Sequence, residues 1–189
     1  MHTEIWLIRH GETEWSKSGQ HTSRTDLPLT QEGEKRAVAL GRVLAGRQFG
    51  KVFSSPMKRA RDTARLAGFD PEILEDLREW DYGQYEGLTS AKIHETKPEW
   101  TIWTGAVPGG ETGAQVATRA DRVIDRALAV GKDVALFAHG HVLRVLGARW
   151  LGMTAEAGKY FALSTATISV LAYEHEQKVL KVWNRDAGS

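Results

Sequence analysis

Residues 7–13 have the sequence LIRHGET, in which an apolar run ends at Ile8 and polar residues follow. The run from Glu4 to Ile8 is too short for a helix, so it predicts a buried strand. Arg9 and His10 follow directly, where that strand should end. Ligands bind beyond the carboxyl ends of the strands in open α/β sheets. We therefore take Arg9 and His10 as the starting point for a functional site.

The overall composition excludes several kinds of site. Across 189 residues, 25 basic and 24 acidic side chains leave a formal net charge of +1, which gives no reason to expect nucleic acid or an anionic membrane as a partner. Cysteine is absent, so disulfides, thiolate zinc sites and a cysteine nucleophile are excluded. The acidic start is unlike a signal peptide, and no apolar run approaches the ~20 residues that span a bilayer. We expect a cytoplasmic protein with one domain over residues 1–189.

The pattern along the chain predicts an α/β fold. Strands are expected at residues 4–8, 51–54, 72–77, 133–138, 166–173 and 178–183, the last two as a hairpin at the sheet edge. Helices are expected at residues 31–45, 56–67, 112–130 and 142–151, with Thr30 capping the first and Ser55 the second. Residues 11–29 and 79–89 are expected to be loops. This alternation predicts a three-layer α/β/α sandwich around a mostly parallel sheet with an antiparallel edge strand.

Three polar clusters come just after predicted strands. They are Arg9-His10, residues 54–59 and residues 139–141. A single arginine or histidine at such a place is more often a surface or capping residue, but the fold brings all three clusters to one edge. Arginine and helix N-termini both favour phosphate. No P-loop pattern is present, and without cysteine the plausible covalent nucleophile is a histidine.

Five segments resemble, in order, the motifs of one known family. They are residues 7–13, 54–64 (SSPMKRARDTA), 77–87 (LREWDYGQYEG), 108–111 (PGGE) and 138–141 (AHGH). Each segment is weak alone, but five at suitable spacing are specific. On these residues the chain resembles the histidine phosphatase superfamily, which also contains the phosphoglycerate mutases.

The resemblance implies a role for each matching residue. His10 matches the nucleophile, and Arg9, Arg59 and His139 match the clamp on the phosphoryl group. Glu79 matches the acid that protonates the leaving oxygen and then activates water. No cofactor or metal is implied.

The resemblance also implies contacts around the phosphoryl group. Gly140 would offer a backbone amide, Thr22 a hydroxyl, and Ser16 stands where the family often has asparagine. Glu12, Glu14 and Glu111 compete with Glu79 as acids on sequence alone, and we interpret Glu12 and Glu111 as structural supports of their loops.

Residues 14–22 and 25–29 look like the branch that contains sedoheptulose-1,7-bisphosphatase and broad-specificity bacterial acid phosphatases. We hypothesise that Arg144 lies one helical turn into the pocket and binds a distal phosphate or acid. Gln20, His21 and Tyr82 would contact the sugar. The alternative is that Arg144 is a surface residue of its helix. The expected partner is a small phosphorylated metabolite, and the chain is expected to be a monomer or homodimer.

Two other functions stay open. The mutases carry an insertion with paired arginines before the PGGE segment, whereas residues 87–107 here hold only Lys92 and Lys97 as basic residues besides a histidine. We therefore predict hydrolysis over phosphoryl transfer. The other alternative is an inactive phosphate-binding regulatory module. The His139/His141 pair has metal-ligand spacing, but it lacks a matching carboxylate pattern and predicts no metal site.

Overall fold

Six strands form one mixed sheet in the computed structural model, which describes residues 3–187. The strand order is β3-β2-β4-β1-β5-β6. The strands are β1 (Ile5–Arg9), β2 (Lys51–Ser54), β3 (Glu72–Ile73), β4 (Val134–Ala138), β5 (Thr167–Glu174) and β6 (Gln177–Asp186). The first four strands pair in parallel, whereas β5 is antiparallel to both β1 and β6. The predicted mostly parallel sheet with an antiparallel hairpin at its edge is confirmed.

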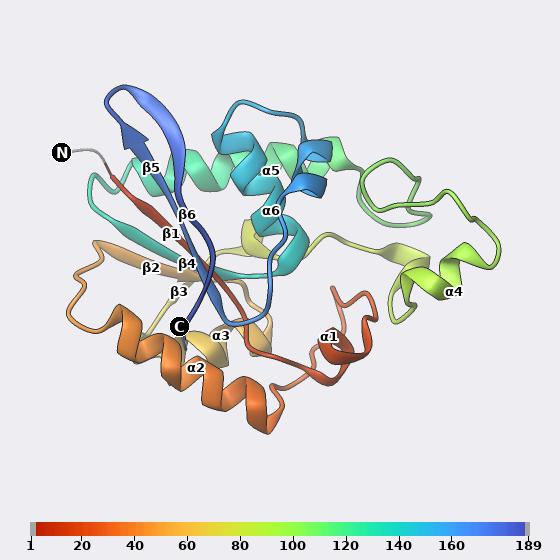
Figure 1. The fold of residues 1–189 in the computed structure, drawn as a ribbon, viewed down its shortest axis with the longest axis horizontal. Helices are drawn as coiled ribbons and strands as arrows, with labels where there is room; N and C mark the ends of the chain where they lie inside the picture. The colour runs from red at the N-terminus through yellow and green to blue at the C-terminus, as the bar shows by residue number, and fades with distance from the viewer. Residues whose placement is uncertain (1–2, 188–189) are drawn as a thin grey trace.

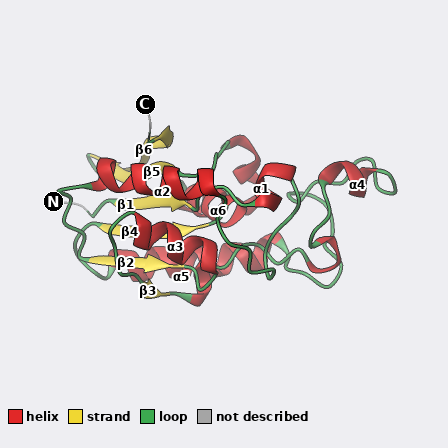
Figure 2. Ribbon diagram, turned by 90° about the horizontal axis from the view of Figure 1, so that it is seen from below, coloured by secondary structure: helices red, strands yellow, loops and turns green. Residues whose placement is uncertain are grey.

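Helices cover both faces of the sheet. Helices α2 (Gln31–Leu44) and α3 (Lys58–Leu66) pack on one face, and α5 (Gly113–Leu128) and α6 (Gly140–Trp150) pack on the other (Figure 1). Figure 2, seen from below, shows α2 and α3 in front of the strands. The predicted three-layer sandwich is therefore confirmed.

Strand β1 supplies both layers of the core, because successive residues of a strand point to opposite faces. Ile5 and Leu7 join the apolar cluster under α5 and α6, whereas Trp6 and Ile8 join the cluster under α2 and α3. Strand β4 is buried along its whole length. Burial on both faces explains why these two strands read as unbroken apolar runs.

Several element boundaries differ from the sequence prediction. The expected loop 11–29 contains α1 (Glu14–Ser18), which Thr13 and Ser16 open through a reciprocal capping box. Helix α3 begins at Lys58 with Met57 as its N-cap, and the Ser55 hydroxyl accepts the N–H of Met57 at 3.3 Å and lies 2.7 Å from Nε2 of His139.

Short elements account for the remaining differences. Only residues 72–73 of the expected strand 72–77 pair with the sheet, and a 3₁₀ turn follows at residues 75–77. Helix α6 begins two residues earlier than expected, at Gly140. Helix α4 (Ser90–His94) and the 3₁₀ turns at residues 83–85 and 155–160 are too short to show an apolar period, so the sequence did not predict them.

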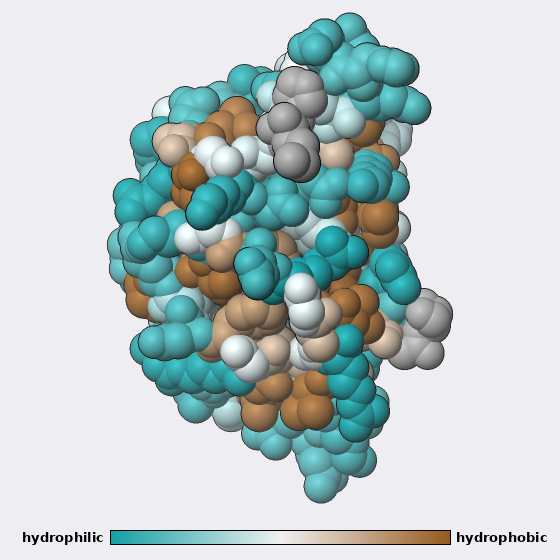
Figure 3. All heavy atoms as spheres, turned by 90° about the vertical axis from the view of Figure 1, so that its left-hand side faces the viewer, coloured by the Kyte–Doolittle hydropathy of each residue, from teal (hydrophilic) through white to brown (hydrophobic). Residues whose placement is uncertain are grey.

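The parallel strands bring three polar clusters to one edge, as predicted. Arg9 at the end of β1 is in register with Ala138 at the end of β4, and Ser54 of β2 is in register with Phe137. Figure 1 shows this edge facing α1 and α4. At the opposite end, which carries the N-terminus, Figure 3 shows brown apolar side chains divided by teal polar ones.

Helix α2 lies close against the turn that follows β1. The backbone N–H of Thr30 donates to the carbonyl of Glu12 at 2.9 Å. A Cβ on Gly33 would lie 2.2 Å from that carbonyl oxygen, and one on Gly11 would lie 2.5 Å from the carbonyl oxygen of Gly33. Two glycines are therefore required for the backbones to approach so closely.

We expect Gly33→Ala to lower the free energy of unfolding by about 1–3 kcal/mol, since the atoms that a new methyl group meets are main chain and must shift. The matched control is Gly113→Ala, where the nearest atom would lie at an ordinary 3.4 Å. Urea unfolding of both variants measures the difference. Equal stabilities would contradict the close packing of α2 against residues 11–12.

Candidate active site

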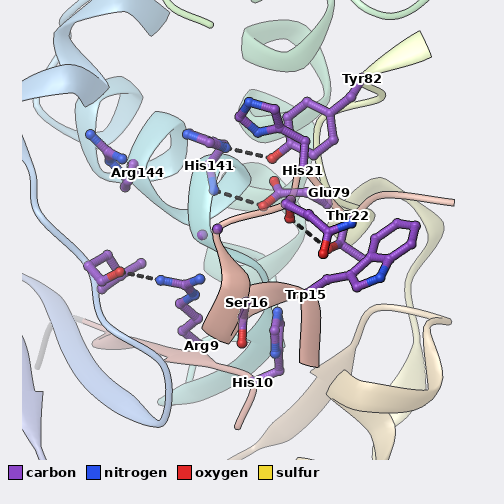
Figure 4. A pocket seen from close by; sticks show the side chains of 14 residues that line it. Arg9, His10, Trp15, Ser16, His21, Thr22, Glu79, Tyr82, His141 and Arg144 are labelled. Carbon is purple, nitrogen blue, oxygen red and sulfur yellow. Dashed lines mark hydrogen bonds between the residues drawn. The ribbon is translucent and has the colours of Figure 1, made fainter. Parts of the chain in front are cut away.

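A cavity of about 240 Å³ opens at the carboxyl edge of the sheet (Figure 4). Its lining includes ten residues that the sequence predicted for the site: Arg9, His10, Ser16, Gln20, His21, Thr22, Glu79, Tyr82, Gly140 and Arg144. It also includes four residues that sequence reasoning did not assign to the site: Trp15, Gly19, His141 and Leu163. Residues of the segments 7–13, 14–22, 77–87 and 138–141 thus meet in one pocket.

His10 is held by its backbone and by its own ring. Its N–H donates to the carbonyl of Ala138 at 3.0 Å, and its carbonyl accepts from Ala166 at 3.0 Å. Nδ1 of the ring lies 2.7 Å from the carbonyl oxygen of Gly11. A carbonyl can only accept, so Nδ1 carries the proton and Nε2 keeps a lone pair.

The surroundings of His10 keep its ring neutral. Burial lowers the pKa of His10 well below 6.5, and the positive charges of Arg59 and Arg9 lower it further. A neutral imidazole with an unprotonated Nε2 is the form that acts as a nucleophile. The geometry therefore presents a nucleophile at neutral pH.

Arg9 places a desolvated positive charge beside the pocket. Its Nη1 donates to the carbonyl of Leu163, which orients the guanidinium, and burial lowers its pKa. Its Nε is buried and has no hydrogen-bond partner among the described residues. A Cβ on Gly140 would lie 3.3–3.5 Å from the guanidinium, so glycine leaves Arg9 its space. A buried donor without a partner is unusual and fits an anionic ligand.

Arg59 and His139 lie beneath the pocket and do not line it. Both are fully buried, and the rings of His139 and His10 are 5.2 Å apart. Arg59 Nε donates to Nδ1 of His139 at 3.2 Å, so the remaining proton of a neutral His139 is on Nε2, which lies 2.7 Å from the Ser55 hydroxyl. The expected clamp of Arg9, Arg59 and His139 therefore has only Arg9 in the wall of the cavity.

The other donors of Arg59 hold a loop. Its Nη atoms donate to the main-chain carbonyls of Thr22, Ser23 and Thr25 at 3.0–3.2 Å. Glu86 holds the same loop from outside, because its carboxylate accepts the amide N–H groups of Ser23 and Thr25 at 2.9–3.0 Å. Glu86 lies in the segment 77–87 that resembles a family motif, but the sequence indicates no role for it.

Glu79 caps helix α6. Its carboxylate accepts the N–H groups of His141 at 2.9 Å, Val142 at 2.8 Å and Trp80 at 2.8 Å. These three hydrogen bonds hold the carboxyl group of Glu79 at the N-terminus of the helix. Glu79 is 5% exposed and lines the cavity. The ring of Trp80 packs in the core, whereas Tyr82 lines the cavity beside Glu79.

The side chains of Ser16, Thr22 and Gln20 line the cavity, but each forms hydrogen bonds to other groups of the protein. Ser16 exchanges hydrogen bonds with Thr13, and Thr22 donates to the carbonyl of Gln20 at 3.0 Å. The Gln20 amide donates to the carbonyl of Gly87 at 2.8 Å. The N–H of Gly140 has no partner among the described residues and remains available to a ligand.

Two other glutamates support loops, as expected. Glu12 accepts the hydroxyl of Thr30 at 2.9 Å. Glu111 accepts the N–H of Asp81 at 2.9 Å and forms an ion pair with Arg119 at 2.9 Å. Neither lines the cavity.

The structure also bears on metal and membrane binding. Among residues 3–187, no three or more His, Asp or Glu side chains gather in a way that could hold a metal ion. No helix within the same residues is long and apolar enough to cross a membrane.

Comparisons with known proteins point to one family. The model of the histidine phosphatase superfamily, branch 1, matches residues 5–186. An acid phosphatase of Mycobacterium tuberculosis is 41% identical, over 94% of this chain and 90% of the relative. A sedoheptulose 1,7-bisphosphatase of Saccharomyces cerevisiae is 37% identical, over 78% of this chain and 67% of the relative. The solved structure of an open reading frame product from Mycobacterium tuberculosis superposes with a TM-score of 0.95 at 38% identity, over 99% and 100% of the two chains.

Buried histidines make the stability depend on pH. The pKa values of His10, His139 and His141 all lie well below 6.5, with burial as the largest cause. In the unfolded chain each takes up a proton near ~6.5. Below that pH the unfolded state therefore binds more protons than the folded state. The free energy of unfolding should fall by up to about 1.4 kcal/mol per pH unit for each histidine as the pH drops from 6.5, and it should level off above 6.5.

Urea unfolding at intervals between pH 5 and pH 8 measures this slope. In His141→Gln the slope of the free energy of unfolding against pH should be smaller by the contribution of one histidine. A wild-type stability that is constant from pH 7 down to pH 5.5 would contradict the neutral state of these rings.

Proposed function

The chain belongs to branch 1 of the histidine phosphatase superfamily, and on that premise we propose that it hydrolyses the phosphomonoesters of small metabolites through a phosphohistidine on Nε2 of His10. Phosphatases among its relatives support the hydrolytic reaction. The observation that carries the proposal is the lone pair of His10 Nε2, held neutral between two arginines.

In the first step, Nε2 of His10 attacks the phosphorus and the bond to the leaving oxygen breaks. Glu79, protonated while a phosphate dianion lies beside it, gives its proton to that oxygen, so an alcohol leaves. The phosphorylated ring is then a cation with its proton on Nδ1, which the carbonyl of Gly11 at 2.7 Å stabilises. Arg9 and the N–H of Gly140 offset charge on the phosphoryl oxygens.

In the second step, the carboxylate of Glu79 takes a proton from water while the water oxygen attacks the phosphorus. The bond between phosphorus and Nε2 breaks, inorganic phosphate leaves, and His10 regains its lone pair. Glu79 ends protonated, ready to serve as the acid again. The amides of His141 and Val142 hold its carboxylate in one position through both steps.

The size and lining of the pocket favour a small, multiply oxygenated substrate. The cavity of about 240 Å³ fits one compact metabolite. Arg144 lines it, with its guanidinium 4.5 Å from the centre of the Trp103 ring and its Nε donating to the carbonyl of Gly158 at 3.0 Å. Its Nη1 has no hydrogen-bond partner among the described residues, so we propose that Arg144 binds a distal phosphate or carboxylate of sugar phosphates or bisphosphates.

We expect His10→Ala to lower turnover of p-nitrophenyl phosphate by at least about 1,000-fold, since the covalent route is lost. Wild-type activity should survive EDTA and fall with vanadate. Denaturing the enzyme during turnover should trap an acid-labile phosphoryl group that mass spectrometry places on His10.

Three results would contradict this mechanism. Loss of activity with EDTA would favour a metal-dependent hydrolase. Interconversion of 2- and 3-phosphoglycerate faster than phosphate release would favour a mutase. A wild-type protein with no turnover at all would favour a phosphate-binding regulatory module.

We expect Arg144→Ala to raise KM for sugar bisphosphates by about 10- to 100-fold, the size of a lost hydrogen bond between charged groups. The increase for monophosphates should be smaller. The matched control is Arg149→Ala on the same helix, because Arg149 is paired with Asp121 outside the pocket. An unchanged KM for bisphosphates would overturn the distal site.

A further inference from the structure

The imidazole of His141 has no role in the proposed mechanism, although it lines the cavity. Only its backbone N–H serves Glu79. Figure 4 shows the ring between Tyr82 and Arg144, with Nδ1 bonded to the Tyr82 hydroxyl.

The bond to Tyr82 defines where the proton of this ring lies. Oη of Tyr82 and Nδ1 of His141 are 2.6 Å apart. Burial raises the pKa of Tyr82 well above 10, so its oxygen keeps a proton, and no other acceptor contacts it among the described residues. With the tyrosine as donor, Nδ1 is the acceptor. Burial and the charge of Arg144 lower the pKa of His141 well below 6.5, so its single ring proton is on Nε2.

The ring is also fixed in orientation. The centre of the Trp103 ring lies 5.2 Å away and that of His21 lies 6.2 Å away. Nε2 has no hydrogen-bond partner among the described residues. A neutral, oriented N–H group beside the general acid is therefore left free in the wall of the pocket.

We propose that Nε2–H of His141 donates a hydrogen bond to a hydroxyl of the leaving group, and that Tyr82 is the positioning residue that holds it in this tautomer. The inference rests on the proposed function and narrows its substrates to phosphate esters of polyols. His141 adds no charge, so it suits an uncharged oxygen, whereas Arg9 and Arg144 serve anionic groups. Its place between Glu79 and Arg144 corresponds to the middle of a sugar phosphate whose ester oxygen faces Glu79.

The test compares glucose 6-phosphate, which carries hydroxyls, with p-nitrophenyl phosphate, which has none. In His141→Ala we expect the ratio of kcat/KM for the sugar phosphate to kcat/KM for the aryl phosphate to fall about tenfold, the size of one neutral hydrogen bond. His141→Gln keeps an N–H donor on a longer chain and should restore part of the ratio.

The tautomer is read separately by ¹⁵N NMR of the wild-type ring, which should show a proton on Nε2 and a bare Nδ1. Tyr82→Phe should convert part of the population to the other tautomer and lower the same kinetic ratio. Its matched control, Tyr160→Phe, removes a hydroxyl from a side chain that is 75% exposed and should change neither.

The outcomes separate this inference from the proposed function. Equal losses for both substrates in His141→Ala, or a wild-type ring protonated on Nδ1, would overturn the role of His141 while phosphatase activity stands. A wild-type enzyme that releases phosphate from neither ester would overturn the proposed function itself.

Discussion

The pocket depends on one interaction, the capture of the first amide groups of α6 by the carboxylate of Glu79. A helix that begins in a buried place must satisfy its first N–H groups, and His139, its N-cap, supplies no side-chain acceptor. Glu79 does so with bonds of 2.9 Å to His141 and 2.8 Å to Val142. The loop that carries Glu79 is thereby fastened to the turn after β4, and the acid cannot move without uncapping the helix. In the proposed mechanism, stability and catalysis thus depend on the same two hydrogen bonds.

A second constraint comes from the arginines, which are fixed by main-chain carbonyls. Arg9 donates to Leu163, Arg144 to Gly158, and Arg59 to the loop of residues 22–25. A guanidinium has five N–H groups in one plane, so hydrogen bonds to carbonyls on one side fix the direction of the remaining N–H groups. These bonds leave the positive charge in place, because a carbonyl carries no net charge. Positive charge and pocket shape are therefore coupled. A substitution of Arg9 or Arg144 therefore changes the wall of the cavity as well as its electrostatics.

This coupling explains how far the sequence could predict the structure. Strong local signals mark the apolar runs of β1 and β4 and the apolar helical repeat along α5. The sequence could therefore predict the sheet, its layers, and the placement of Arg9 and His10 beside the turn that begins α6. Helix α1 was missed because its five residues have no buried member and depend on a capping box. The burial of Arg59 beneath the cavity was missed because it depends on loop carbonyls far away in sequence. No local pattern marks Leu163 as the acceptor of Arg9.

The positive charges of the arginines have two effects on the pocket, and these effects oppose each other when His10 becomes cationic. Arg59 and Arg9 lower the pKa of His10 and so keep its ring unprotonated, and in the proposed mechanism the arginines also attract a phosphate dianion. In the proposed mechanism the substrate resolves this tension, because its negative charge offsets the arginines once it is bound. The ring of His10 then becomes cationic on phosphorylation next to a dianionic group and the carbonyl of Gly11. A neutral ligand would supply no such counter-charge, so a pocket of this kind favours phosphate esters at both binding and the covalent step.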